Sequence, residues 1–197
     1  MDAPTRHFLQ ARTRPGELVL EIGCGPGQYR YAVNGDYIGT DITGKPYNDE
    51  LPRTPDAVAG AASLPFRGAA FDLVFFSNLF HYFGAPLEIL GEAMRVLKPG
   101  GWLLIFDYSK PTLERLRERY RETSPGFTAH PHACRDWLAL MTEAGLAEAD
   151  LVTKGVSPAH RLLRLLHNPL TRALYHAVID SREAAICVAG RKPRAGG

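Results

Sequence analysis

The 197-residue sequence lacks the features of a membrane protein, a disulfide-stabilised protein or a strongly charged one. No apolar run approaches the length of a transmembrane helix, and residues 1–17 have no apolar core of the signal-peptide type. The three cysteines lie far apart and form no C-x-x-C pair, which argues against a disulfide framework or a zinc site. The formal net charge is only +2, so the chain has no strong positive electrostatic field that would favour binding to nucleic acid. We therefore expect a cytoplasmic protein with reduced thiols, no transmembrane segment and no metal.

The composition is that of an ordinary globular protein. With 45% hydrophobic and 22% charged residues, the chain can build a sizeable core. We expect residues 1–197 to form a single domain, with a short N-terminal cap over residues 1–16 and a helical insert over residues 155–180.

The chain is organised around an apolar stretch that turns directly into a glycine-rich loop. Residues 18–22 predict a buried strand, and Gly23, Gly25 and Gly27 follow at every second position. A strand that breaks into a glycine loop before a helix is where α/β sheets bind nucleotides; a tight turn without a ligand is the alternative. A dinucleotide fingerprint would need a glycine in place of Gln28, and the phosphate loop G-x-x-x-x-G-K-[ST] is absent, so neither motif fits.

Strand-like and helix-like segments alternate along the chain, which predicts an α/β fold with a parallel sheet. The expected strands cover residues 17–22, 36–41, 56–59, 71–77, 102–106, 146–153 and 184–190. The expected helices cover residues 28–33, 86–97, 110–123, 134–144, 159–167 and 169–179.

Several motifs resemble those of the class I S-adenosylmethionine (SAM)-dependent methyltransferases. The glycine loop reads E-x-G-x-G-x-G, similar to motif I of that family. Residues 64–66 read L-P-F, residues 71–74 resemble the fourth strand, and residues 95–101 read R-V-L-K-P-G-G, the signature before strand five. The resemblance runs from about residue 17 to residue 101 in motif order. It implies a Rossmann-like, doubly wound, seven-stranded and mostly parallel sheet whose last strand, over residues 184–190, is antiparallel.

The resemblance also implies SAM as the cofactor and S-adenosylhomocysteine (SAH) as its product. Glu21 matches the acid that supports the loop or interacts with the methionine amino group, an attraction between opposite charges. Asp41 matches the ribose-binding acid, because one carboxylate can accept protons from both ribose hydroxyls. The other positions expected to contact SAM are Gly23, Cys24, Gly25, Gly27, Ile42, Ala61, Ala62, Ser63, Leu64, Ser77, Asn78 and Leu79.

The chain departs from the family pattern at Gly60. The family often has D-A-x-x-L-P-F here, and its acid contacts the adenine amino group, whereas this chain has glycine in place of the acid. The backbone of Ala61 and Ala62 and packing by Leu64 could still hold the ring. One partly exposed hydrogen bond is worth about 0.5–1.5 kcal/mol, so we expect weakened SAM binding.

Methyl transfer needs mainly alignment, and a base only where the acceptor must lose a proton. His81 matches a histidine that is frequent in the family after strand four, and histidine titrates near neutral pH. Asp107 and Tyr108 end the fifth strand at the same edge of the sheet. These three residues are the candidate catalytic residues; a packed histidine at a helix start is the alternative for His81. An aromatic face, from Tyr29 or Tyr82, could bind the sulfonium cation.

Two further candidate bases, His130 and His132, lie in a loop over residues 124–132. No third ligand stands at a recognisable spacing, so we expect no metal there. Residues 155–180 combine apolar and positive side chains, which suits either core-covering helices or a lid over an apolar or anionic acceptor.

Three functions fit the sequence. The leading one is a SAM-dependent methyltransferase for a small-molecule acceptor. The second is an RNA or protein methyltransferase, whose mark would be an appended basic domain that this sequence does not show. The third is a non-catalytic SAM-fold binding module or partner subunit, because fold alone does not establish activity. A homodimer could cover the site that the short cap leaves open.

Overall fold

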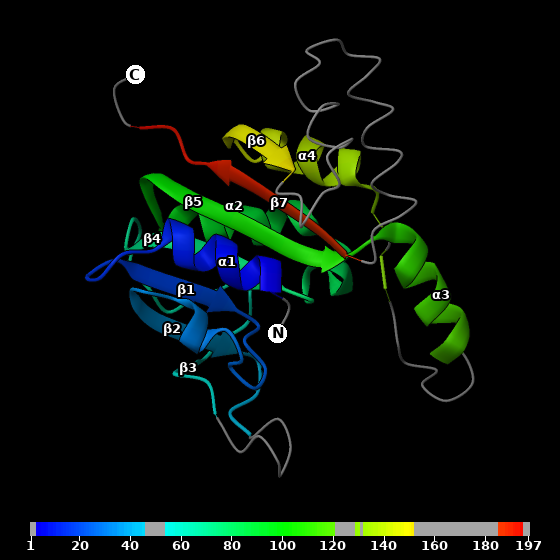
Figure 1. The fold of residues 1–197 in the computed structure, drawn as a ribbon, viewed down its shortest axis with the longest axis horizontal. Coiled ribbons are helices and arrows are strands. Elements are labelled where there is room, and N and C mark those ends of the chain that lie inside the picture. Colours follow the sequence, from blue (N-terminus) through cyan, green and yellow to red (C-terminus); the bar gives the residue numbers. More distant parts are fainter. Residues whose placement is uncertain (1–2, 46–53, 121–128, 131, 152–184, 195–197) are drawn as a thin grey trace.

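The computed structural model describes residues 3–45, 54–120, 129–130, 132–151 and 185–194. Its centre is a seven-stranded sheet in the order β3-β2-β1-β4-β5-β7-β6 (Figure 1). The strands are β1 (Leu18–Ile22), β2 (Asp36–Asp41), β3 (Ala57–Val58), β4 (Phe71–Ser77), β5 (Leu97–Tyr108), β6 (Ala147–Leu151) and β7 (Ala185–Arg191). Strands β1 to β5 pair in parallel, and β7 runs antiparallel between β5 and β6. The predicted α/β sheet with an antiparallel strand near residue 190 is confirmed.

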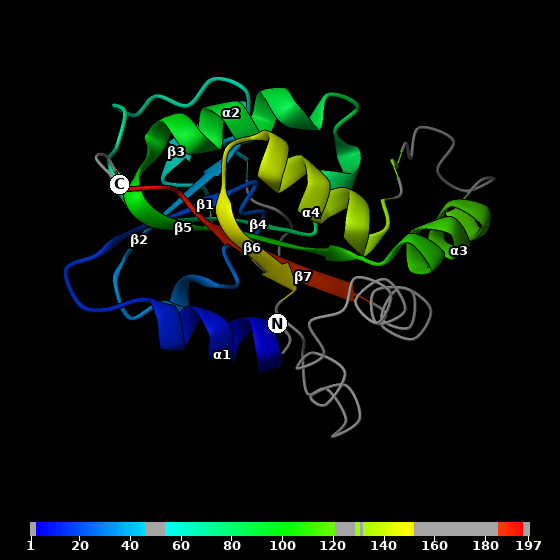
Figure 2. The same ribbon diagram turned by 90° about the horizontal axis from the view of Figure 1, so that it is seen from above.

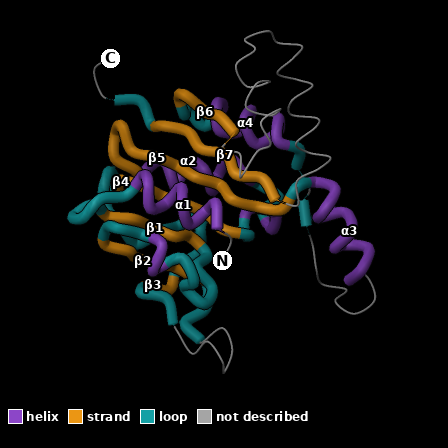
Figure 3. The backbone as a smooth tube through the Cα atoms, in the orientation of Figure 1, coloured by secondary structure: helices purple, strands orange, loops and turns teal. Residues whose placement is uncertain are grey.

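Helices cover both faces of the sheet. Helix α1 (Ala3–Arg12) lies on one face, and α2 (Pro86–Val96) and α4 (Cys134–Glu143) lie on the other (Figure 2). Helix α3 (Lys110–Tyr120) follows β5 and lies beyond the carboxyl end of that strand (Figure 3). Because α1 and the pair α2 and α4 lie on opposite faces, the strands form a central layer between helices (Figure 3). Within the described part of the chain, no helix is long and apolar enough to cross a membrane.

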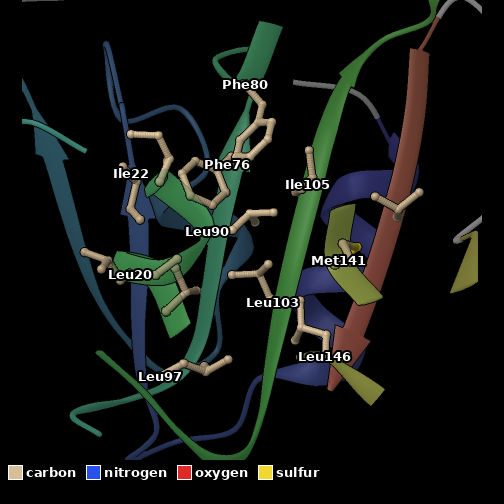
Figure 4. Close-up of a cluster of buried hydrophobic side chains, with 14 of the residues drawn as sticks. Leu20, Ile22, Phe76, Phe80, Leu90, Leu97, Leu103, Ile105, Met141 and Leu146 are labelled. Atoms are coloured by element: carbon tan, nitrogen blue, oxygen red, sulfur yellow. The ribbon is translucent and has the colours of Figure 1, made fainter. Parts of the chain in front are cut away.

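A buried core fills each side of the sheet because successive side chains of a strand point to opposite faces. Phe75 of β4 packs with Phe8 and Leu9 of α1, whereas the next residue, Phe76, belongs to the cluster under α2 and α4. Figure 4 shows the second cluster, with Leu20, Ile22, Phe76, Phe80, Leu90, Leu97, Leu103, Ile105, Met141 and Leu146. Burying one such side chain contributes about 1.5–3 kcal/mol, so these clusters hold the helices on the sheet.

The helix expected over residues 28–33 is one 3-10 turn, Arg30–Ala32. A longer helix does not form here, because tertiary contacts hold residues 34 and 35 in place. The Asn34 amide donates to the carbonyl oxygen of Gln10 at 2.8 Å, and a Cβ at Gly35 would overlap backbone oxygens. The prediction was wrong because tertiary contacts, which periodicity does not report, end the segment early.

Strand β5 starts at Leu97, five residues before the predicted Trp102. The K-P-G-G segment was expected to lie between the helix and the strand, yet Leu97 already pairs with Phe71. The register shifts between Phe71 and Leu73, which accommodates the irregular start. Strands β2 and β4 have the predicted bounds, and the other described elements lie close to theirs. The helices expected over 159–167 and 169–179, and the insert that contains them, lie outside the described residues.

Candidate active site

The glycine loop follows β1 at the carboxyl edge of the parallel strands. Gly23, Gly25 and Gly27 have φ values of 70°, 48° and 65°, which glycine adopts without strain. A Cβ at Gly23 would also overlap the side chain of Leu79, which follows β4. The first glycine is therefore required both by its backbone and by its contact with the neighbouring strand end.

Glu21 lies under this loop, only 1% exposed. Its Oε2 accepts a short hydrogen bond from the hydroxyl of Tyr37. Arg30 lies over the Tyr37 ring at 4.5 Å and forms an ion pair with Asp56 at 2.6 Å. No ion pair involves Glu21 within the described ranges. Burial raises the pKa of Glu21 to about 8, so its carboxyl group is protonated at neutral pH.

Asp41 ends β2 and turns its carboxylate toward the glycine loop. Its Oδ2 accepts the backbone N–H of Gly25 at 2.9 Å. The next residue, Ile42, is 80% exposed, and Val58, the register partner of Asp41 in β3, is exposed too. An acid is thus flanked by exposed apolar side chains, an arrangement suited to a ribose and the base attached to it.

Cys24 is a packing residue of the loop. Its Sγ lies against β2, where a Cβ at Gly39 would be 2.9 Å away. Burial, followed by the nearby carboxylates, raises the pKa of the Cys24 thiol to about 12. The thiol is therefore protonated and is not a nucleophile at neutral pH.

The L-P-F loop and the R-V-L-K-P-G-G motif are joined by hydrogen bonds. Glu92 accepts the backbone N–H of Leu64 at 2.7 Å and pairs with Arg95 at 2.7 Å, and Arg95 donates to the Leu64 carbonyl oxygen at 3.1 Å. Ala61 is half-buried, and Ala62 and Ser63 are exposed. A Cβ at Gly60 would meet nothing within 4 Å, so the position that lacks the family's acid has free space.

Two buried polar atoms at the end of β4 have no hydrogen-bond partner among the described residues: Ser77 Oγ and Asn78 Oδ1. Asn78 also has a φ of 52°, a left-handed conformation that is uncommon outside glycine. Buried polar atoms in proteins are nearly always paired with protein, water or ligand. Because β4 lies beside β1 in the sheet, these atoms sit near the Glu21 end of β1.

His81 and Asp107 form a buried pair where the 3-10 turn η2 (Phe80–Tyr82) meets the end of β5. His81 Nδ1 lies 2.6 Å from Asp107 Oδ1, and the His81 backbone N–H donates to Asp107 Oδ2 at 2.9 Å. The side chains are 2% and 1% exposed. Asp107 Oδ1 also accepts the Tyr108 backbone N–H at 2.7 Å, and the Tyr108 ring lies 5.8 Å from His81. The three candidate catalytic residues therefore lie together.

The other predicted aromatic and histidine candidates differ in where they lie relative to His81. Tyr29 is buried in the core on the α1 side, edge-on to Phe75, so the structure does not support its predicted contact with the cofactor. Tyr82 is exposed and its ring lies 4.1 Å from that of His81. The His130 backbone N–H donates to the His81 carbonyl oxygen at 2.7 Å. In the part of the chain that the structure describes, no group of three or more acidic, histidine or cysteine side chains could hold a metal.

Two residues of this region were not identified from the sequence. Tyr37, the second residue of β2, donates to Glu21, and the glycine motif on the neighbouring strand does not indicate this bond. Trp137 in α4 is buried beside His132, with ring centroids 4.5 Å apart. Its indole N–H has no partner in the described chain.

A glycine loop after β1, with acids at the ends of β1 and β2, defines a nucleotide-type cofactor site on a doubly wound sheet. The methyltransferase domain family matches residues 20–105. The chain is 30% identical to the ubiquinone/menaquinone biosynthesis C-methyltransferase UbiE of Laribacter hongkongensis, over 81% of each chain. It therefore belongs to the class I SAM-dependent methyltransferases.

Two further relatives match over smaller shares. The chain is 33% identical to the probable tRNA methyltransferase 9B of Homo sapiens, over 58% of this chain and 26% of that one. It is 31% identical to the 27-O-demethylrifamycin SV methyltransferase of Amycolatopsis mediterranei, over 68% and 55%. The chain thus spans about a quarter and about half of these two relatives.

The fold matches solved structures across nearly the whole chain. The YcgJ protein from Bacillus subtilis superposes with a TM-score of 0.66 at 20% identity, covering 97% of this chain and 98% of that one. The geranyl diphosphate C-methyltransferase from Streptomyces coelicolor, solved with SAH, gives a TM-score of 0.61 at 14% identity, with 96% and 78% covered. At these identities the comparison establishes the fold.

Proposed function

We propose that this protein methylates a small-molecule acceptor whose nucleophilic atom carries a proton, and that His81 removes that proton. The observation that carries the proposal is the buried contact of His81 Nδ1 with Asp107 Oδ1 at 2.6 Å. A carboxylate at this position keeps the proton on Nδ1 and leaves Nε2 with a lone pair, so His81 can act as a base. Asp107 is a positioning residue because its second oxygen is already bonded to the His81 backbone.

The cofactor site is proposed from groups that suit SAM. Glu21, Ser77 Oγ and Asn78 Oδ1 offer acceptors for the methionine ammonium group, and the last two have no partner in the described chain. Asp41 would hold the ribose hydroxyls, and Ile42 would lie against the adenine. Gly23, Gly25 and Gly27 allow the backbone to approach the cofactor, together with the main chain of Cys24.

The reaction balances with these parts. SAM supplies an electrophilic methyl group on a sulfonium sulfur. As the acceptor atom bonds to the methyl carbon, the carbon–sulfur bond would break and its electron pair would remain on sulfur, leaving SAH. The acceptor proton passes to His81 Nε2. A positioned base of this kind contributes about 10²–10⁴-fold in rate, in addition to the alignment of the reactants.

A small-molecule acceptor is supported by the extent of the similarity. The match that spans 81% of both chains is to a quinone-biosynthesis enzyme, whereas the match to the tRNA methyltransferase covers 26% of that protein. The 33% identity to the tRNA enzyme favours tRNA as the second candidate acceptor. Transfer of labelled methyl from SAM to bulk tRNA, with none to small molecules, would establish the second candidate.

The cofactor assignment is tested by thermal melting with SAM, SAH and, as a control, NAD. At about 100 times the dissociation constant, a ligand adds about 2.7 kcal/mol of stability, a shift of roughly 5–11 °C for a chain of this size. We expect the shift with SAM and SAH only. Asp41→Ala should abolish it, and Asp36→Ala, at the exposed start of the same strand, should keep it. A shift that survives Asp41→Ala would contradict the ribose assignment.

The base is tested with His81→Asn. Asparagine can still donate to Asp107 from its amide but has no Nε2, so we expect SAH release from a panel of phenols, quinols, thiols and amines to fall about 10²–10⁴-fold. The melting shift with SAH should stay. His7→Asn, on the exposed face of α1, is the matched control and should keep full turnover. SAM binding without turnover of any acceptor by the unmodified protein would favour a non-catalytic module or partner subunit.

A further inference from the structure

Two buried nitrogens beside the proposed base have no hydrogen-bond partner among the described residues. They are Nε1 of Trp137, in α4, and Nε2 of His132, just before α4. Trp137 is 1% exposed, and the two ring centroids lie 4.5 Å apart. A buried donor left unpaired costs about 1–3 kcal/mol. Two such atoms, on contacting rings five residues apart in the chain, therefore point to a polar group that binds to both of them.

The pair lies next to the candidate catalytic residues. The Trp137 ring is 4.9 Å from that of Phe80, the residue that precedes His81. Phe80 in turn contacts Phe83, with centroids 5.7 Å apart. The segment that carries His132 is also tied to His81, because the His130 backbone N–H donates to the His81 carbonyl oxygen at 2.7 Å. The two nitrogens thus lie close to the turn that carries His81, among aromatic rings that suit contact with another flat ring.

The chemistry of the two nitrogens restricts the ligand group. The indole N–H of Trp137 can only donate, so the group must accept a hydrogen bond. His132 is held neutral, since burial lowers its pKa, and a neutral ring nitrogen either accepts or donates. A hydroxyl group satisfies both atoms at once, because it accepts from the indole and donates to a lone pair on Nε2. An ammonium group satisfies only one of them.

We propose that Trp137 and His132 form an acceptor-recognition subsite that binds a ring hydroxyl of an aromatic methyl acceptor. This inference rests on the proposed function, and it names the class of acceptor. The hydroxyl bound here orients the ring, while His81 serves the atom that is methylated.

The chain offers a direct spectroscopic test because it contains two tryptophans, and hence two indole N–H signals. Trp102 lies on the α1 side of the sheet, where Arg12 covers its ring at 4.4 Å, so it is an internal control. The ¹⁵N-labelled protein, saturated with SAH, is titrated with 2-naphthol, 2-methoxynaphthalene and naphthalene. These probes share a ring system; the first accepts and donates, the second only accepts, and the third does neither.

We expect the Trp137 signal to shift with 2-naphthol, less with 2-methoxynaphthalene and least with naphthalene, while the Trp102 signal stays in place. Trp137→Phe keeps a ring but removes the donor, so it should weaken 2-naphthol binding about fivefold and leave naphthalene binding unchanged. Trp102→Phe should change neither. The unmodified protein gives the spectral result even if Trp137→Phe does not fold.

Three results would overturn the inference. The Trp137 signal could stay in place with every probe, it could respond equally to naphthalene, or it could show contact with an ordered water that 2-naphthol does not displace. Because SAH binding is measured separately by melting, these failures are distinct from failure of the proposed function. Loss of the SAH shift would overturn the cofactor assignment itself.

Discussion

Replacing Glu21 by glutamine should remove a pH dependence of stability that the buried carboxyl group imposes. The pKa of this group is about 8 in the folded protein, against 4.5 as its ordinary value, chiefly because of burial. Between these values the unfolded chain has lost the proton and the folded chain has kept it. Unfolding therefore releases a proton, and stability falls as the pH rises from about 4.5 to about 8.

The magnitude follows from the shift. Each pH unit inside this window costs about 1.4 kcal/mol, so the free energy of unfolding should drop by roughly 3 kcal/mol between pH 5 and pH 8. For a chain of this size that drop lowers the melting temperature by roughly 6–12 °C. Glutamine has nearly the same shape as glutamate and can still accept a hydrogen bond from the Tyr37 hydroxyl. Glu21→Gln should therefore lose the pH dependence of stability without leaving a cavity.

The assay is urea or thermal unfolding of both proteins at pH 5, 6.5 and 8. Other groups titrate equally in both, so the difference between the two curves isolates Glu21. Glu114→Gln, on the exposed side of α3, is the control and should follow the unmodified protein. Parallel curves for the unmodified protein and Glu21→Gln would refute the reasoning, because they would mean that Glu21 is ionised when folded.

Two further substitutions test the glycines. Gly23→Ala should destabilise the protein more than Gly16→Ala does. Both glycines have positive φ, which costs alanine about 1–2 kcal/mol. Only at Gly23 would the new Cβ also overlap a side chain, that of Leu79. Urea unfolding measures the difference, and equal losses would show that the Leu79 contact does not matter. Gly60→Asp should strengthen SAH binding about 2- to 13-fold by supplying one hydrogen bond to the adenine, since nothing lies within 4 Å of the new Cβ. Calorimetric titration checks this, with Gly60→Ala as the control; unchanged affinity would place the adenine elsewhere.

Local patterns predicted the elements whose signal is local. Strand β4, a continuous apolar run between turns, has the bounds that its composition indicates. Strand β5 was predicted too short, because Pro99, Gly100 and Gly101 are typical of a turn. In the structure Gly101 packs closely: a Cβ there would be 2.8 Å from the Asp72 carbonyl oxygen on the next strand. That contact depends on sheet order, which one segment does not encode.

For the candidate site, individual residues could be predicted from the sequence, but their contacts with one another could not. Family resemblance named His81, and the position at the end of the fifth strand named Asp107, but their pairing across 26 positions follows only from the adjacency of β4 and β5. Tyr29 was misplaced because the expected helix over residues 28–33 is a single turn, and the ring instead fills the core beside Phe75. The donors Tyr37 and Trp137 carry no motif of their own.

The short turn after the glycine loop has a consequence for ligand charge. A full helix would point its amide groups and the positive end of its dipole at the loop, which favours a phosphate. Arg30–Ala32 is one 3-10 turn, so the loop lacks that row of amide groups and that dipole. A pyrophosphate bound here would lose its hydration and gain few protein donors in return. The methionine end of SAM is zwitterionic, so its ammonium group balances the charge of its carboxylate. The brevity of this segment thus favours the zwitterionic methionine end of SAM over the pyrophosphate of a dinucleotide.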